Sequence, residues 1–198
     1  LLSFVSLEEN NNCFSEEFSF EQLDKQLGDI KNCLETSSDK WTSHQMANIF
    51  NQLQTLAAII QKKDNKALQN LLAKNCSAPT VPENGGLLCA SVKNRTFCKP
   101  MCNEGYDFNF IRRSRLFEEC SASTKHKWTT QFIGGNKLAI CIKSHLSVSG
   151  APTAYFDGLD CHKTKSDVQL VENITSVFQS ELAMVGITEI ESLRLFCG

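Results

Sequence analysis

The sequence predicts an α+β protein in which disulfide bonds support several small segments. The chain has 198 residues and ten cysteines, and six of these cysteines lie between Cys76 and Cys141. Apolar residues repeat at helical spacing before that stretch, whereas turn-forming, aromatic and β-branched residues dominate within it. We therefore expect three segments: a helical bundle at residues 1–75, a small all-β module at 76–141, and a strand–helix–strand segment at 142–198.

The first segment is expected to contain three amphipathic helices. Ser19 and Gln22 fit a capping box at a helix start, and polar breaks at residues 36–39 and 62–65 separate a second helix and a short third one at 66–74. Short breaks favour an antiparallel bundle, in which the apolar stripes form the core or, alternatively, a partner groove or lipid pocket. The stripes comprise Phe20, Leu23, Leu27, Ile30 and Leu34, then Met46, Ile49, Phe50, Leu53, Leu56, Ala57 and Ile60.

The last segment combines both kinds of structure. Residues 142–155 are strand-like, with a turn signal at Ser149-Gly-Ala-Pro, and Ser166 begins a helix whose apolar residues repeat at helical spacing. The run 187–197 alternates in polarity towards its end and indicates a strand. Cys161 and Cys197 flank this helix and strand, so they form a natural disulfide pair.

Cysteine usage and glycosylation patterns together indicate a secreted, extracellular glycoprotein. Acceptor patterns for N-linked glycans occur at Asn75, Asn94 and Asn173, and the cysteine count is even. A bridge from Cys13 to Cys33 would join the first helix to the residues before it. The chain starts without an initiator methionine, so we expect the tail of a signal peptide or the first residues after cleavage, within a longer protein.

Charge and hydropathy exclude some partners. Twenty Lys and Arg residues oppose twenty-two Asp and Glu residues, and the net charge of −2 favours neither nucleic acid nor an anionic membrane. No apolar run approaches the roughly 20 residues needed for a transmembrane helix.

The central stretch contains a recognisable set of motifs. It opens with Cys76-Ser-Ala-Pro and Pro82-Glu-Asn-Gly, continues with Cys102-Asn-Glu-Gly-Tyr, and ends with Cys120, Trp128 and Cys141. This stretch resembles a sushi (complement control protein) module with an additional disulfide, and the resemblance covers about a third of the chain. It implies bridges Cys76–Cys120 and Cys102–Cys141 around a buried Trp128, which leaves Cys89 and Cys98 to close a short loop. It also implies a binding or spacing role.

Motifs for catalysis and metal binding are missing from the sequence. His44, His126, His145 and His162 lie in unrelated segments, and neither a nucleophile motif nor a phosphate-binding glycine loop occurs. Cys98 and Cys102 have zinc-like spacing without a second ligand pair, so disulfides are the favoured interpretation. The acidic pairs Glu16-Glu17 and Glu118-Glu119 are expected to be solvated. We expect no enzymatic activity, no cofactor and no metal.

One basic cluster could bind a sulfated glycan or an acidic partner. Its members are Arg112, Arg113, Arg115, Lys125 and Lys127, which neighbouring strands could bring onto one face. The alternative is that these residues are scattered over a solvated surface.

Two hypotheses for function follow. The favoured one is a non-enzymatic extracellular binding or adhesion protein, or a fragment of a larger mosaic protein, whose sushi-like module contacts an extracellular protein or a sulfated glycan. The alternative is a free secreted carrier or signalling protein whose helical segment encloses a small apolar ligand.

Overall fold

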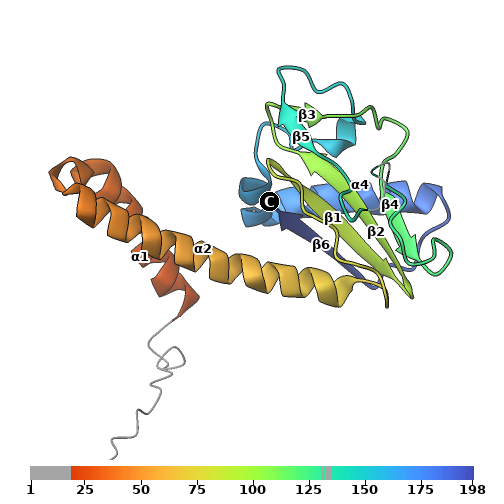
Figure 1. Cartoon of the computed structure of the whole chain (residues 1–198), viewed down its shortest axis with the longest axis horizontal. Helices are drawn as coiled ribbons and strands as arrows, with labels where there is room; N and C mark the ends of the chain where they lie inside the picture. The colour runs from red at the N-terminus through yellow and green to blue at the C-terminus, as the bar shows by residue number, and fades with distance from the viewer. Residues whose placement is uncertain (1–18, 131, 133–134) are drawn as a thin grey trace, which may run out of the picture. The chain divides into compact units, whose positions relative to one another are not determined.

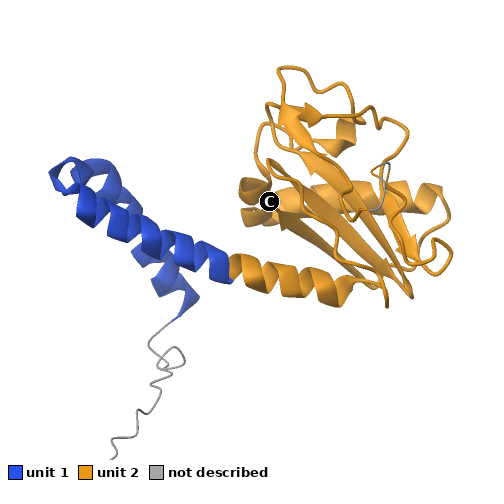
Figure 2. Cartoon of the chain, viewed as in Figure 1, with its two compact units in different colours: residues 1–59 blue, residues 60–198 orange. Residues whose placement is uncertain are grey.

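The computed structural model describes residues 19–130, 132 and 135–198. The chain divides into two compact units, residues 1–59 and residues 60–198 (Figure 2). Within the described ranges, the fold is α+β and combines four α-helices with an antiparallel sheet and four disulfides. Among the described residues, none of the helices combines the length and apolar character required to cross a membrane.

Helix α1 (Phe20–Ser37) begins as the sequence predicts. The Ser19 hydroxyl accepts from the backbone N–H of Gln22, and the Gln22 side chain accepts from the backbone N–H of Ser19, which completes the capping box. A short 3₁₀ helix, η2 (Ser38–Lys40), separates α1 from α2 (Ser43–Leu71).

The expected three-helix bundle is wrong in two respects. Helix α2 continues through Lys62–Asn65 to Leu71, so the expected second and third helices are one. The polar run contains neither glycine nor proline, and its residues are compatible with a helix. In addition, no residue of α1 is buried, and the apolar stripe of α2 as far as Ile60 is largely exposed. The stripes therefore do not form a bundle core in this chain.

The second unit contains a four-stranded sheet in the order β4-β2-β1-β6, in which all neighbours are antiparallel (Figure 1). The strands are β1 (Gly85–Val92), β2 (Arg95–Cys102), β4 (Glu118–Ser121) and β6 (Ser192–Cys197). A tight turn at Lys93 and Asn94 joins β1 to β2, and Lys93 has the positive φ of 52° that such hairpin turns require.

The expected boundary between residues 76–141 and 142–198 is not a boundary between compact units. Strand β6 pairs with β1 over six residue pairs, from Gly86–Cys197 to Ser91–Ser192, so the two segments share one sheet. A small second sheet crosses the same boundary, because β3 (Tyr106–Phe108) pairs with β5 (Cys141–Lys143). Pairing between strands so distant in sequence leaves no local signal, which is why composition alone placed a boundary there.

The helical part of residues 142–198 begins earlier than the sequence indicates, whereas its long helix begins slightly later. A short helix, α3 (Cys161–Ser166), precedes α4 (Val168–Met184), and the Asp167 side chain, not Ser166, caps α4. The expected strand at 142–155 is short, because after β5 the chain forms a loop and the 3₁₀ helix η3 (Pro152–Ala154).

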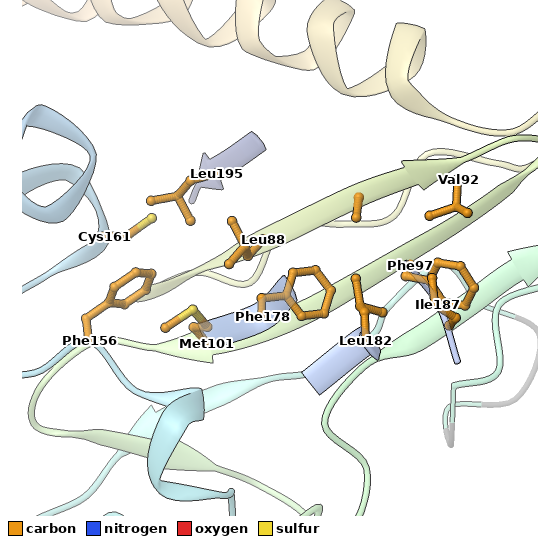
Figure 3. Close-up of a cluster of buried hydrophobic side chains, with 11 residues drawn as sticks. Leu88, Val92, Phe97, Met101, Phe156, Cys161, Phe178, Leu182, Ile187 and Leu195 are labelled. Carbon is orange, nitrogen blue, oxygen red and sulfur yellow. The ribbon is translucent and has the colours of Figure 1, made fainter. Parts of the chain in front are cut away.

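The main core lies between α4 and the sheet. Phe178 and Leu182 of α4 are fully buried against side chains from three strands, which include Leu88, Phe97, Met101 and Leu195 (Figure 3). A second buried cluster contains Trp128, Leu68 and Leu138, and the Trp128 indole N–H donates to the carbonyl of Ser77 at 2.8 Å.

Four disulfides join the pairs that the sequence analysis expects. These bridges are Cys76–Cys120, Cys89–Cys98, Cys102–Cys141 and Cys161–Cys197. Cys89 and Cys98 lie directly opposite each other in the β1–β2 hairpin, with Cα atoms 4.1 Å apart. Cys33 is exposed and has no disulfide partner among the described residues, and its expected partner Cys13 lies outside them.

Candidate binding cleft

The five basic residues expected to form one face do not do so. Arg112 is only 3% exposed, and its guanidinium donates to the carbonyls of Leu138 and Arg115 and lies 3.5 Å from the Glu118 carboxylate. Its desolvation lowers the pKa of the guanidinium, while the Glu118 charge opposes that shift. Arg112 therefore holds the loop between β3 and β4 in place and is inaccessible to a polyanion.

The remaining basic residues are dispersed. Arg115 is half-buried and forms an ion pair with Glu118, at 2.8 Å, and a hydrogen bond to the carbonyl of Thr129. Lys125 and Lys127 are exposed on the turn after β4. Arg113 points towards the loop after β5, where its Nε donates to the carbonyl of Val148 at 2.7 Å.

Arg113 borders an open cleft of about 910 Å³ in the second unit. Four parts of the chain form its walls: the turn after β2, the loop between β3 and β4 that carries Arg113, the loop after β5, and the segment around η3. The side chains that could contact a ligand through charge or hydrogen bonds are Glu104, Arg113, Ser144, His145, Ser147, Tyr155 and Asp157.

A single buried carboxylate shapes one wall of this cleft. Asp107 on β3 accepts hydrogen bonds from the backbone N–H groups of Val148 and Ser149, from the Ser149 hydroxyl, and from the phenol of Tyr155. Burial alone would raise the pKa of Asp107, but these hydrogen bonds and one from the N–H of Phe108 outweigh it and lower the pKa. Asp107 thus remains charged and anchors the loop after β5.

Gly150 allows that loop to approach β3 closely. A Cβ atom at this position would lie 2.5 Å from the ring of Phe108 and 3.0 Å from the Tyr155 hydroxyl, so a larger residue would displace the wall. The N–H of Gly150 donates to the same hydroxyl at 2.7 Å. The turn signal at Ser149-Gly-Ala-Pro indicated a change of direction here, but not its role in a cleft.

The charges of the cleft are of both signs. Arg113 is fixed to Val148, in the loop after β5, through its hydrogen bond. The Glu104 carboxylate lies beside Gly158, since a Cβ atom at Gly158 would be 3.8 Å from its Oε2 atom. Asp157 directly precedes Gly158 in the chain, so two acidic residues lie in this part of the cleft. The backbone N–H of Glu104 donates to the carbonyl of Leu159, which attaches this acidic part to the segment after η3.

Sequence reasoning identified Arg113 but missed the other important residues of the cleft. Asp107 and Tyr155 are separated by 48 residues and meet only because β3 pairs with β5. The one local signal was the Cys102-Asn-Glu-Gly-Tyr motif, whose Glu104 and Gly105 form the turn at one wall.

The three glycosylation acceptors all have exposed asparagines. Asn94 lies in the β1–β2 turn, Asn173 lies on α4, and Asn75 has a φ of 69° just before Cys76. Each is accessible to a glycan on the folded protein.

The zinc-like spacing of Cys98 and Cys102 does not correspond to a metal site. Cys98 is bonded to Cys89 and Cys102 to Cys141, so neither sulfur is available as a thiolate ligand. Within residues 19–130, 132 and 135–198, no group of three or more His, Cys, Asp or Glu side chains is placed to hold a metal ion.

Comparison with known proteins yields no relative. No family model matches the chain, and neither a curated protein nor a solved structure is significantly similar to it.

Proposed function

We propose that this chain is a non-enzymatic extracellular binding protein whose cleft accepts a polypeptide segment that bears both an acidic and a basic side chain. The observation that carries this proposal is the 910 Å³ cleft bordered by Arg113, Glu104 and Asp157. A cleft of this size is in the range of ligand sites, which occupy about 300–1,000 Å³.

The walls of the cleft are fixed before any ligand binds. Asp107 holds the loop after β5, the Cys102–Cys141 bridge joins β2 to β5, and the N–H of Phe156 donates to the carbonyl of Cys102 at 3.0 Å. A preformed site avoids the entropic cost of ordering loops upon binding. The rigid part of the chain is therefore suited to recognition.

The mixed charges favour a protein partner over a sulfated glycan. A uniformly anionic glycan would be attracted by Arg113 but repelled by Glu104 and Asp157, whereas a peptide with charges of both signs can complement the whole cleft. In addition, Arg112 is buried, so the basic face expected to bind a glycan lacks one of its charges.

The alternative of a carrier with a ligand enclosed by its helices is less well supported. The cleft and the four smaller cavities found are all lined by residues from 61 to 198. The apolar residues of α1 face solvent, with Leu27 being 42% exposed and Ile30 46% exposed.

The resemblance of residues 76–141 to a sushi module is part of the proposal. Its support is the pair of bridges Cys76–Cys120 and Cys102–Cys141 together with the buried Trp128. In this chain, β6 pairs with β1 of that stretch, and α4 packs on the sheet to form a core. Residues 76–141 are therefore part of a larger unit and not a separate small module.

A peptide-display selection tests the cleft directly. Random peptides displayed on phage are selected against the disulfide-bonded protein, and the affinities of selected synthetic peptides are measured by fluorescence anisotropy. We expect Arg113→Gln and Asp157→Asn each to weaken binding about tenfold, as expected for loss of a well-placed charged contact. Lys125→Gln, which changes an exposed charge outside the cleft, is the matched control.

Two outcomes would overturn this proposal. One is that the cleft variants bind the selected peptides as tightly as the control does. The other is that the protein is retained on heparin above physiological salt and loses retention in Arg113→Gln, which would identify a sulfated glycan as the ligand. Near-ultraviolet circular dichroism verifies that each variant keeps its fold.

Extracellular location is tested separately through glycosylation. Expression in a secreting eukaryotic cell should yield glycans at Asn94 and Asn173, both exposed on the fold, with Asn75 occupied less because of the adjacent Cys76 bridge. Peptide-N-glycosidase followed by mass spectrometry identifies the occupied sites. Secreted protein without any glycan would contradict this part of the proposal.

A further inference from the structure

Helix α1 has an apolar stripe that is not buried among the described residues of its own unit, 19–59. Successive residues of the stripe are separated by three and then four positions along the helix. The exposed fractions of their side chains are 76% for Phe20, 39% for Leu23, 42% for Leu27 and 46% for Ile30. Leu34 continues the pattern in the last turn. Alternation of three and four is the heptad spacing by which two helices pack side by side in a coiled coil.

Two charges beside this stripe are arranged for self-recognition. Asp24 and Lys31 are seven residues apart, so they occupy the same heptad position along one border of the stripe. When two identical helices pack antiparallel, each such position faces its counterpart on the other helix. Asp24 of one copy then lies opposite Lys31 of the other, and symmetry produces this attractive pair twice.

A parallel arrangement gains nothing from these charges. In that case Asp24 would face Ser19 and Lys31 would face Gln26 on the opposite border of the stripe, and both of these residues are uncharged. The charges therefore select the antiparallel orientation.

Other occupants of the stripe are less well matched. Between Ser43 and Ile59, α2 contains no Asp, Glu, Lys or Arg, so its borders offer no ion pair to Asp24 or Lys31. A lipid surface is disfavoured because α1 carries four acidic and only two basic residues, whereas helices that lie on membranes are rich in Lys and Arg.

We propose that α1 pairs antiparallel with α1 of a second copy of this chain, which makes the protein a homodimer. In the interface between the two helices, Leu23 of one copy packs against Leu34 of the other, and Leu27 packs against Ile30. Symmetry forms each of these contacts twice. Ion pairs between Asp24 of one copy and Lys31 of the other lie along the border of this interface. The inference is independent of the cleft, which lies in the other unit.

Charge exchange in the full-length, disulfide-bonded protein tests this pairing. Sedimentation equilibrium over a range of concentrations gives the dimer dissociation constant for the wild type, Asp24→Lys and Lys31→Asp. Each single variant converts two attractive pairs into two repulsive ones and should raise that constant about tenfold. The double variant D24K/K31D should restore it, and an equal mixture of the two single variants should form heterodimers.

The matched control is Lys25→Asp, which changes the same charge on the opposite side of α1 and should leave the dissociation constant unchanged. Far-ultraviolet circular dichroism verifies that α1 stays helical in every variant. A protein that is monomeric at all concentrations overturns the proposal, as does a monomer that binds phosphatidylcholine–phosphatidylserine vesicles. A dimer whose dissociation is insensitive to both single exchanges shows that another surface associates, and this also overturns it.

Discussion

Helices α1 and α4 have the same kind of apolar stripe, but only α4 buries it. Phe178 and Leu182 of α4 are fully buried, whereas Leu27 and Ile30 of α1 remain nearly half exposed. The stripe of α4 faces a sheet whose strands supply apolar side chains such as Leu88, while no residue of α1 is buried. Periodicity thus predicts which face of a helix is apolar, but not what covers that face.

The two units also differ in how they are cross-linked. Among the described residues, the four disulfides all lie within residues 60–198, and one of them, Cys161–Cys197, joins the start of α3 to the end of β6. Disulfides stabilise a fold chiefly by restricting the unfolded chain. We therefore expect the second unit to hold its structure alone and the first to depend on association.

The largest expected effect comes from a buried ion pair that fixes α4 to the sheet. Lys99 of β2 donates to both oxygens of Glu181 at 2.7 and 2.6 Å, and both residues are almost fully buried. Burial lowers the pKa of Lys99, although the Glu181 carboxylate opposes this. Glu181→Ala should lower the free energy of unfolding by about 3–5 kcal/mol, because it leaves a buried charge unpaired. Chemical denaturation with intact disulfides measures this.

Two control variants distinguish the effect of the Lys99–Glu181 ion pair from the effect of any substitution in α4 on stability. Glu172→Ala removes an exposed carboxylate from the same helix and should change the stability by less than about 0.5 kcal/mol. Replacing both Lys99 and Glu181 by methionine should cost much less than Glu181→Ala, since no charge is left unpaired. An equal loss in the double variant would show that packing, not the charge, accounts for the effect.

The next effect concerns the bridge between Cys161 and Cys197. Its removal by a double serine substitution frees a loop with a sequence separation of 36 residues and should cost about 3–4 kcal/mol. Cys33→Ser in the first unit should have almost no effect on the same transition. Denaturation followed by near-ultraviolet circular dichroism compares them. Equal stability of the double variant and the wild type would contradict a structural role for this bridge.

The sequence predicted local features well. The capping box of Ser19 and Gln22, the amphipathic α4 and the four disulfide pairs all follow from residue types at short spacing or from the sushi resemblance. What it did not predict depends on pairing at long range. Neither the contact between β6 and β1 nor the meeting of Lys99 with Glu181, 82 residues away, leaves a local signal.

The basic cluster shows the same limit for a functional site. The sequence placed Arg112, Arg113 and Arg115 together because they lie within four residues of one another, but Arg112 is buried beside Glu118 and Arg113 faces the cleft. Adjacent residues in a loop point in different directions, so proximity in sequence does not define a shared face. The cleft itself depends on Asp107 and Tyr155, whose contact requires the β3–β5 pairing.

A smaller effect should be visible in the cleft wall at high pH. Burial and the hydrogen bond to Asp107 raise the pKa of Tyr155 from 10.0 to about 12. The folded state therefore holds this proton more tightly than the unfolded state, and the resulting stabilisation, complete below pH 10, is lost as the pH rises through about 12. Ultraviolet absorbance of phenolate should show this late ionisation in the wild type and in Tyr106→Phe, but not in Tyr155→Phe. Ionisation of Tyr155 near its ordinary pKa would contradict the closed geometry of the wall.

The smallest effect on the second unit should come from the helix that leaves its stripe exposed. Leu27→Ala and Leu182→Ala remove the same atoms from two amphipathic helices, one 42% exposed and the other fully buried. Leu182→Ala should destabilise residues 60–198 by about 2–5 kcal/mol, because it leaves a cavity in the core. Leu27→Ala should change that transition by less than about 0.5 kcal/mol, because Leu27 belongs to the other unit. In a Trp41→Phe background, fluorescence of the buried Trp128 reports the unfolding of this unit alone. A large effect of Leu27→Ala on that signal would mean that the two units unfold together, and the contrast between α1 and α4 would then no longer hold.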